Sequence, residues 1–158
     1  MVFVARKMKE YPLTDEQIGQ LLKESLYGRL AIVGEEGYPR VKAVHFLYHE
    51  GCIYIYAFHR GQRLRDIRRN TKVCFEVEQM EGVLTTTLGE PNPDAHYQWV
   101  EILGDAVLME DLEMKREILD AFARKYLSTD KADLSEDQVR NMSVVEIMIH
   151  QTNGKCYK

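Results

Sequence analysis

The feature that most constrains the fold is a series of short apolar segments separated by glycine-containing turns. In residues 52–58 the side chains alternate between two faces with the period of a β-strand, and both faces are apolar or aromatic. Strands that follow one another through short turns favour an antiparallel barrel over a doubly wound parallel sheet. We expect about six strands, at residues 29–34, 40–48, 52–58, 71–79, 97–109 and 144–150.

Helical periodicity is confined to a few stretches, so the expected class is mainly β with flanking helices. The first helix follows Thr14, a good N-cap residue, and Gln17 is placed as in a capping box. Residues 80–96 are rich in Gly, Pro, Thr and Asn and are expected to form an exposed loop. We predict helices at residues 15–26, 62–70 and 111–126.

The length of 158 residues fits one domain, and the 45% hydrophobic and 29% charged composition excludes a disordered chain. No stretch approaches the roughly 20 apolar residues of a membrane helix, and residues 1–11 do not have the pattern of a signal peptide. The three cysteines, Cys52, Cys74 and Cys156, are far apart and form no CxxC pair. We therefore expect no disulfide framework or zinc site, and a cytoplasmic location.

The net charge of -4 excludes a generally basic nucleic-acid binder, but it hides a basic segment at residues 59–72. This segment, HRGQRLRDIRRNTK, holds six basic side chains and one acidic side chain. A local cationic segment in an acidic chain indicates a small anionic ligand more than a polyanion. The pattern contains neither a Walker loop nor a Rossmann glycine motif.

The basic segment lies where a strand passes through Gly61 into a short helix. Free backbone N–H groups and the helix dipole favour an anion at such a helix start. Arg60 and Arg63 are near enough to add charge-assisted hydrogen bonds to phosphate oxygens, whereas Arg65, Arg68 and Arg69 lie further along. The alternative is that the helix simply shows its arginines to water.

Several short motifs resemble the FMN-binding split-barrel proteins, a superfamily that includes pyridoxamine 5'-phosphate oxidase. The nitroimidazole-resistance-type branch is the most similar part of that superfamily. The resemblance covers nearly the whole chain and is most specific between residues 28 and 75. The motifs are Tyr27-Gly28-Arg29-Leu30-Ala31, Gly37-Tyr38-Pro39, Ala43-Val44-His45-Phe46, Gly51-Cys52-Ile53-Tyr54, Gly61-Gln62-Arg63-Leu64 and the run from Ile67 to Phe75.

The resemblance implies a single FMN-binding split-barrel domain over residues 1–158 that forms a homodimer. Two FMN molecules would lie in clefts at the subunit interface. One strand would lie along the isoalloxazine ring, and the next would pass beside the ring and the ribityl chain. The residues concerned are Lys42, Ala43, Val44 and His45 on the first strand, and Tyr56 and Ala57 on the second.

The resemblance also implies a phosphate site at Gln62, Arg63 and Leu64, with Arg63 as the basic ligand. Trp99 falls on a strand that faces the flavin cleft, from the same or the neighbouring subunit. The family often has His at the position of Tyr56 and Ser at the position of Trp99, so this chain departs from the pattern at both.

From the sequence alone, several of these residues have two possible interpretations. His45 is either an interior or interface histidine, or a donor at the flavin edge that stabilises the reduced ring electrostatically. Tyr56 either packs against the dimer mate or touches flavin, and Trp99 is either a core residue or a stacking lid. No histidine pair has the spacing of a metal site.

We expect an FMN-dependent oxidoreductase that passes reducing equivalents from NAD(P)H through FMN to a small electrophile such as a nitroaromatic or a quinone. This explains why no nucleophile or acid–base pair stands out, because the flavin supplies the chemistry. One alternative is a flavin- or haem-binding sensor or storage module without turnover. Another is an interaction protein whose basic segment docks an anionic partner. Neither nucleic acid nor membrane is expected as a partner.

Overall fold

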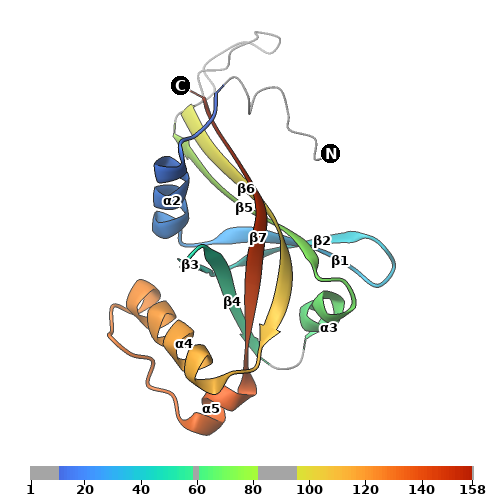
Figure 1. Ribbon diagram of the computed structural model, residues 1–158, viewed down its shortest axis with the longest axis vertical. Coiled ribbons are helices and arrows are strands. Elements are labelled where there is room, and N and C mark those ends of the chain that lie inside the picture. Colours follow the sequence, from blue (N-terminus) through green and yellow to red (C-terminus); the bar gives the residue numbers. More distant parts are fainter. Residues whose placement is uncertain (1–10, 59–60, 82–95, 158) are drawn as a thin grey trace.

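The computed structural model describes residues 11–58, 61–81 and 96–157 (Figure 1). Within these ranges the chain forms seven strands and four helices. The helices are α2 (Asp15–Glu24), α3 (Gln62–Arg69), α4 (Leu112–Tyr126) and α5 (Glu136–Asn141). The strands are β1 (Gly28–Val33), β2 (Pro39–Val44), β3 (Leu47–His49), β4 (Cys52–Phe58), β5 (Lys72–Glu81), β6 (His96–Met109) and β7 (Met142–Tyr157).

All seven strands belong to one antiparallel sheet, in the order β2-β1-β5-β6-β7-β4-β3. The two end strands, β2 and β3, are neighbours in the chain and are joined only by residues 45–46. The sheet must therefore curl until its ends approach each other, as in a barrel. The predicted class, mainly antiparallel β with flanking helices, is confirmed, and the strand count is seven.

The additional strand arises because residues 40–48, predicted as one strand, divide at His45 and Phe46. The Phe46 backbone N–H donates a hydrogen bond to the Tyr126 hydroxyl group at 3.0 Å instead of to a neighbouring strand. The chain leaves the ladder at this point, so β2 and β3 are separate.

Two further boundaries differ from the sequence prediction. The last strand, predicted at residues 144–150, runs from Met142 to Tyr157. The helix α5 was not predicted, although Ser135 and Gln138 form a complete capping box at its start. The loop predicted at residues 80–96 differs at both ends, because residues 80–81 belong to β5 and residue 96 belongs to β6. Residues 82–95 lie outside the described ranges.

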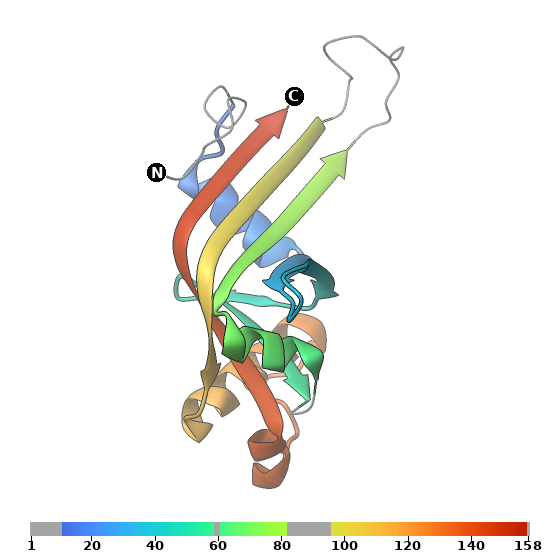
Figure 2. The same cartoon turned by 90° about the vertical axis from the view of Figure 1, so that its right-hand side faces the viewer.

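The long strands curve over the molecule (Figure 2), and the register breaks at Gly104. The ladder between β6 and β7 shifts between Leu103 and Gly104. A Cβ atom at Gly104 would lie 2.4 Å from the backbone oxygen of Met148, so only glycine permits this close approach.

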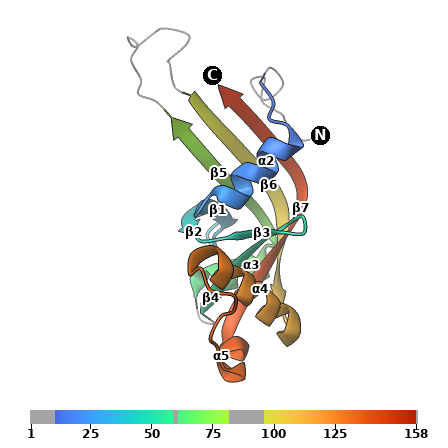
Figure 3. The same cartoon turned by 90° about the vertical axis from the view of Figure 1, so that its left-hand side faces the viewer.

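Two hydrophobic clusters hold the fold together. The larger one fills the inside of the curled sheet and is closed by α2, whose Leu21 and Leu22 are buried. The predicted capping box of Thr14 and Gln17 is present at the start of α2. The second cluster lies between α4, α5 and the strands β3, β4 and β7. Figure 3 shows α2 and the pair α4 and α5 toward opposite ends of the molecule.

Candidate functional site

The edge of β2 is open to a ligand, because β2 pairs with β1 and with no other strand in the described ranges. Lys42 and Ala43 are exposed, whereas the Val44 side chain is buried in the core. An edge strand presents unpaired backbone N–H and C=O groups on its outer side. These groups can hydrogen-bond a planar heterocycle. Because its side chain is buried, Val44 offers only its backbone groups to such a ligand.

The edge of β2 spans the space between α3 and α4. Near its start, the Arg40 guanidinium lies 3.9 Å from the Asp66 carboxylate of α3. Just beyond its end, the His45 ring lies 4.8 Å from the Tyr126 ring of α4. A ligand along this edge would therefore have α3 at one end and α4 at the other.

A series of aromatic ring contacts brings two of the predicted site residues, Tyr56 and His45, to the same side of α4. The Tyr56 and Phe122 rings meet edge to face at 4.9 Å, and the Phe122 and Tyr126 rings are stacked at 5.9 Å. The Tyr126 ring then contacts the exposed His45 ring. Ala57, which follows Tyr56, packs partly against the core.

Lys125 is a site residue that no sequence pattern predicted. Its Nζ donates a hydrogen bond to the Phe46 carbonyl oxygen at 3.1 Å and lies 4.2 Å from the centroid of the Phe46 ring. Burial lowers the pKa of the Lys125 ammonium group to about 8. A cation is thus held beside the segment that carries His45. A single lysine on a helical stripe gave no sequence signal for this contact.

The start of α3 has the features of an anion site. Its N-cap is Gly61, and no side-chain capping hydrogen bond is present there, unlike at the starts of α2, α4 and α5. A Cβ atom added at Gly61 would meet no described atom within 4 Å, so space is open beside the helix end. The first amides of the helix are therefore free to bind an anion.

Arg63 adds a cation to this helix start. The Arg63 side chain is half-buried, yet within the described ranges it has neither a hydrogen bond nor an ion pair. Burial alone lowers the pKa of its guanidinium. A desolvated, unpaired guanidinium is costly unless an anion joins it. Arg60 lies outside the described residues.

The other two predicted phosphate residues do not offer free side chains. The Gln62 amide donates a hydrogen bond to Asp66 at 3.0 Å and accepts one from Arg65 at 2.5 Å. Leu64 is 1% exposed and belongs to the core. Both residues can approach a ligand only through their backbone N–H groups.

The buried Asp66 carboxylate organises the cations around α3. It is completely buried, and one of its oxygens accepts hydrogen bonds from Gln62 and, at 3.3 Å, from Arg69. Its other oxygen has no hydrogen bond in the described ranges and faces Arg40 at the ion-pair distance given above. Arg40 is thus held beside α3, and no local sequence pattern predicts this pairing because Arg40 and Asp66 are far apart in the chain.

Trp99 is separated from the other predicted site residues within one chain. Two strands, β1 and β5, lie between β2 and β6, a distance of roughly 14 Å across the sheet. The next residue, Val100, is buried, so Trp99 points away from the core. The Lys155 Nζ lies 5.0 Å from the centroid of the Trp99 ring.

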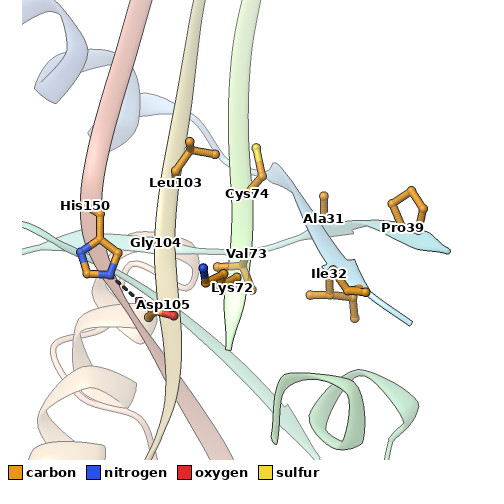
Figure 4. Close-up of a pocket in the computed structure, with 11 residues that line it drawn as sticks. Ala31, Ile32, Pro39, Lys72, Val73, Cys74, Leu103, Gly104, Asp105 and His150 are labelled. Carbon is orange, nitrogen blue, oxygen red and sulfur yellow. Dashed lines mark hydrogen bonds and ion pairs between the residues drawn. The ribbon is translucent and has the colours of Figure 1, made fainter. Parts of the chain in front are cut away.

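A groove on the outer side of the sheet contains none of the predicted site residues (Figure 4). It has a volume of about 510 Å³ and is lined by residues of strands β1, β2, β5, β6 and β7. In it, His150 Nε2 lies 2.5 Å from Asp105, which also accepts a hydrogen bond from Thr71 at 2.6 Å. The Thr71 and His150 hydrogen bonds lower the pKa of Asp105. No group of three metal-ligating side chains occurs among the described residues.

Residues 14–156 match the family of pyridoxamine 5'-phosphate oxidase, so the chain belongs to this family, whose members bind flavins. No curated protein matches the sequence. No helix in the described part of the chain is long and apolar enough to cross a membrane.

Solved structures with the same fold confirm the predicted split barrel. A candidate 5-nitroimidazole antibiotic resistance protein from Bacteroides thetaiotaomicron has a TM-score of 0.80 at 23% identity, over 92% of this chain and 86% of its own. An FAD- and haem-binding protein from Mycobacterium smegmatis has a TM-score of 0.81 at 16% identity, over 92% and 72%. An FAD-binding protein from Mesorhizobium loti has a TM-score of 0.67 at 17% identity, over 92% and 96%.

Proposed function

We propose that this chain is a homodimeric FMN-dependent oxidoreductase. It would pass reducing equivalents from NAD(P)H to a small electrophile such as a nitroaromatic or a quinone. The observation that carries the proposal is Arg63, a half-buried guanidinium that lacks a partner in the described ranges and stands at an uncapped helix start. A single phosphate group supplies the charge that this site needs.

The other residues fit the remaining parts of FMN. The open edge of β2 offers backbone donors and acceptors along Lys42, Ala43 and Val44. His45 and Tyr56 both contact aromatic rings of α4, and the proposal places the isoalloxazine ring beside them. When bound, the flavin supplies the electron-transfer chemistry, so the chain itself needs only to bind and orient.

The dimer is part of the proposal because of Trp99. This ring lies across the sheet from the edge of β2. A second subunit would bring it to the flavin there, which supports the dimer in this proposal. FMN is preferred to FAD because the described site has one uncapped helix start and one unpaired arginine, which suit one phosphate better than a dinucleotide.

Replacing Arg63 tests the phosphate site directly. The variant Arg63→Ala should bind FMN roughly 10- to 150-fold more weakly, the loss expected for one charge-assisted contact. Arg68→Ala is the matched control, since it removes the same charge from the exposed side of the same helix. FMN fluorescence quenching measures both affinities. Equal affinities in the two variants would contradict the assignment of Arg63.

The alternative of a binding module without turnover is distinguished by a second measurement. A module would hold its cofactor but show no reduction on addition of NADH or NADPH under anaerobic conditions. A Soret band in the purified protein would favour the haem-binding alternative. An oxidoreductase should instead lose its visible flavin absorption on reduction and regain it when a nitroaromatic acceptor is added.

A further inference from the structure

A second cavity lies between α4, strand β4 and the segment of residues 127–134 that connects α4 to α5. Figure 1 shows this connector returning alongside α4. The cavity has a volume of about 350 Å³, which lies within the range of small-ligand pockets. Its walls are mainly apolar and aromatic, with Tyr56, Leu119, Phe122, Tyr126, Leu134 and Met142 among them.

The walls of this cavity are held apart by polar contacts between α4 and the connector. The Asp120 carboxylate accepts a hydrogen bond from the Ala132 backbone N–H at 2.8 Å. Arg116 donates to the Leu134 carbonyl at 3.1 Å, and Arg124 donates to the Asp130 carbonyl at 3.0 Å. The connector therefore cannot close onto the apolar face of α4 without losing these bonds. A preformed apolar cavity of this kind suits a ligand.

The polar residues at the cavity, which are Tyr56, Tyr126 and the acidic Asp133, limit what the ligand can be. The Tyr126 hydroxyl already bonds the Leu26 carbonyl at 2.7 Å and the Phe46 backbone, so it contributes only its ring. The Tyr56 hydroxyl has no hydrogen-bond partner in the part of the chain that the structure describes. Burial raises the pKa of the Tyr126 phenol, whereas its hydrogen bond with the Phe46 backbone lowers it.

We infer that this cavity binds a small, neutral, planar aromatic molecule that carries a nitro or carbonyl oxygen, which accepts a hydrogen bond from the Tyr56 hydroxyl group. The rings of Phe122 and Tyr126 provide aromatic surface for it. The inference rests on the proposed function in one respect. Tyr56 is also a predicted flavin contact, so the molecule bound in this cavity would be the electron acceptor of the proposed reaction.

The first test compares two probes that differ only in the acceptor group, 4-nitrobenzyl alcohol and benzyl alcohol. Isothermal titration calorimetry of the full chain loaded with FMN should show roughly 2- to 10-fold tighter binding of the nitro compound, the value of one neutral hydrogen bond. Tyr56→Phe should abolish this preference and leave the affinity for benzyl alcohol nearly unchanged. A preference that survives in Tyr56→Phe would overturn the role of Tyr56.

The second test fills the cavity. Ala132→Leu places a larger side chain in the wall and should weaken binding of both probes at least 10-fold, with FMN affinity unchanged. Lys131→Leu is the matched control, because it introduces the same side chain at an exposed neighbour outside the cavity. Wild-type affinity for the probes in Ala132→Leu would overturn the inference.

A third measurement needs no variant that could fail to fold. In protein labelled at the methionine methyl groups, the Met142 signal should shift as 4-nitrobenzyl alcohol is added, whereas the signal of the exposed Met114 on α4 should not. An unchanged Met142 signal would overturn the inference. Displacement of the probe by FMN would also do so, because the cavity would then belong to the flavin site.

The inference and the proposed function can fail separately. If the probes bind at Met142 but the chain does not bind FMN in a fluorescence titration, the cavity remains a ligand site and the oxidoreductase assignment fails. If FMN binds and neither probe does, only the inference about the cavity fails.

Discussion

The Tyr126 hydroxyl group joins α4 to Phe46, the residue at which the chain leaves β2 and turns into β3. It accepts the Phe46 backbone N–H at 3.0 Å and lies within donating distance of the carbonyl oxygens of Phe46, at 2.8 Å, and Leu26, at 2.7 Å. Lys125, one residue earlier, donates to the same Phe46 carbonyl. The end of α4 therefore fixes the corner of the barrel that carries His45.

Removing this hydroxyl should destabilise the fold. Tyr126→Phe leaves the Phe46 N–H without its partner, and a buried unpaired backbone group costs about 1–3 kcal/mol. Urea unfolding should show a lower free energy of unfolding by about that amount. Tyr38→Phe, at a side chain that is 71% exposed, is the control and should change stability by less than about 0.5 kcal/mol. Similar effects of the two substitutions would contradict the structural role of Tyr126.

The buried Asp66 carboxylate should be a second sensitive position. Asp66→Asn removes the negative charge that Arg40 and Arg69 approach. The free energy of unfolding should fall by about 2–4 kcal/mol. The partial solvation of both arginines limits this loss. Thermal and urea unfolding measure it. Arg68→Ala on the same helix should have little effect. An Asp66→Asn protein as stable as the wild type would show that the ion pairs do not hold α3 against β2.

Lys125 should make stability depend on pH in alkaline solution. Burial lowers its pKa in the folded protein from 10.5 to about 8, so between these values the unfolded chain binds more protons than the folded one. The contribution of Lys125 to the free energy of unfolding therefore rises as the pH increases from about 8 to 10.5. The gain should be of order 1 kcal/mol, because the ammonium group is only half-buried.

The variant Lys125→Met isolates this contribution. It removes the titrating group but keeps an apolar stem against Phe46. The difference in unfolding free energy between the wild type and Lys125→Met, measured at pH 7.5 and pH 10, should move in favour of the wild type at the higher pH. A difference that is the same at both values would contradict the lowered pKa.

Mixed dimers test whether Trp99 acts across the subunit interface. Arg63→Ala and Trp99→Ala should each weaken FMN binding in their own homodimers. A dimer with one subunit of each kind has one intact site if Trp99 serves the neighbouring subunit's flavin, because one Arg63 and one Trp99 then meet. Titration should show one tight FMN site per mixed dimer. Two weak sites would mean that Trp99 serves its own subunit's flavin, and an unchanged FMN affinity in the Trp99→Ala homodimer would mean that Trp99 has no contact with flavin.

The sequence pattern predicted the strands and the first helix well, because alternation and capping are local. The division at Phe46 could not be predicted, since it depends on a hydrogen bond from Tyr126, which is distant in the chain. The same limit applies to the pairing of Arg40 with Asp66. The capping box of Ser135 and Gln138 was visible in the sequence, but α5 spans only six residues and lacks a clear apolar period.

For the site, the sequence predicted the helix start at Gly61 and the cation Arg63, which the structure places together. It could not distinguish side chains that face a ligand from those that face the core. Leu64 and Val44 are buried, and Gln62 is engaged by Asp66, so these residues can meet a ligand only through their backbone or after rearrangement. The inward direction of Leu64 follows from the helical period, whereas the contact of Gln62 with the buried Asp66 could not be read from that period.

We propose that the chain binds FMN at the edge of β2 and the start of α3. An FMN titration of the purified, cofactor-free protein, followed by flavin fluorescence and visible absorbance, tests it most directly. We expect saturable binding with one FMN per chain and a shifted flavin spectrum, and both should be lost at the same FMN concentrations in Arg63→Ala. A fluorescence signal that stays proportional to added FMN, with an unshifted spectrum, would contradict it.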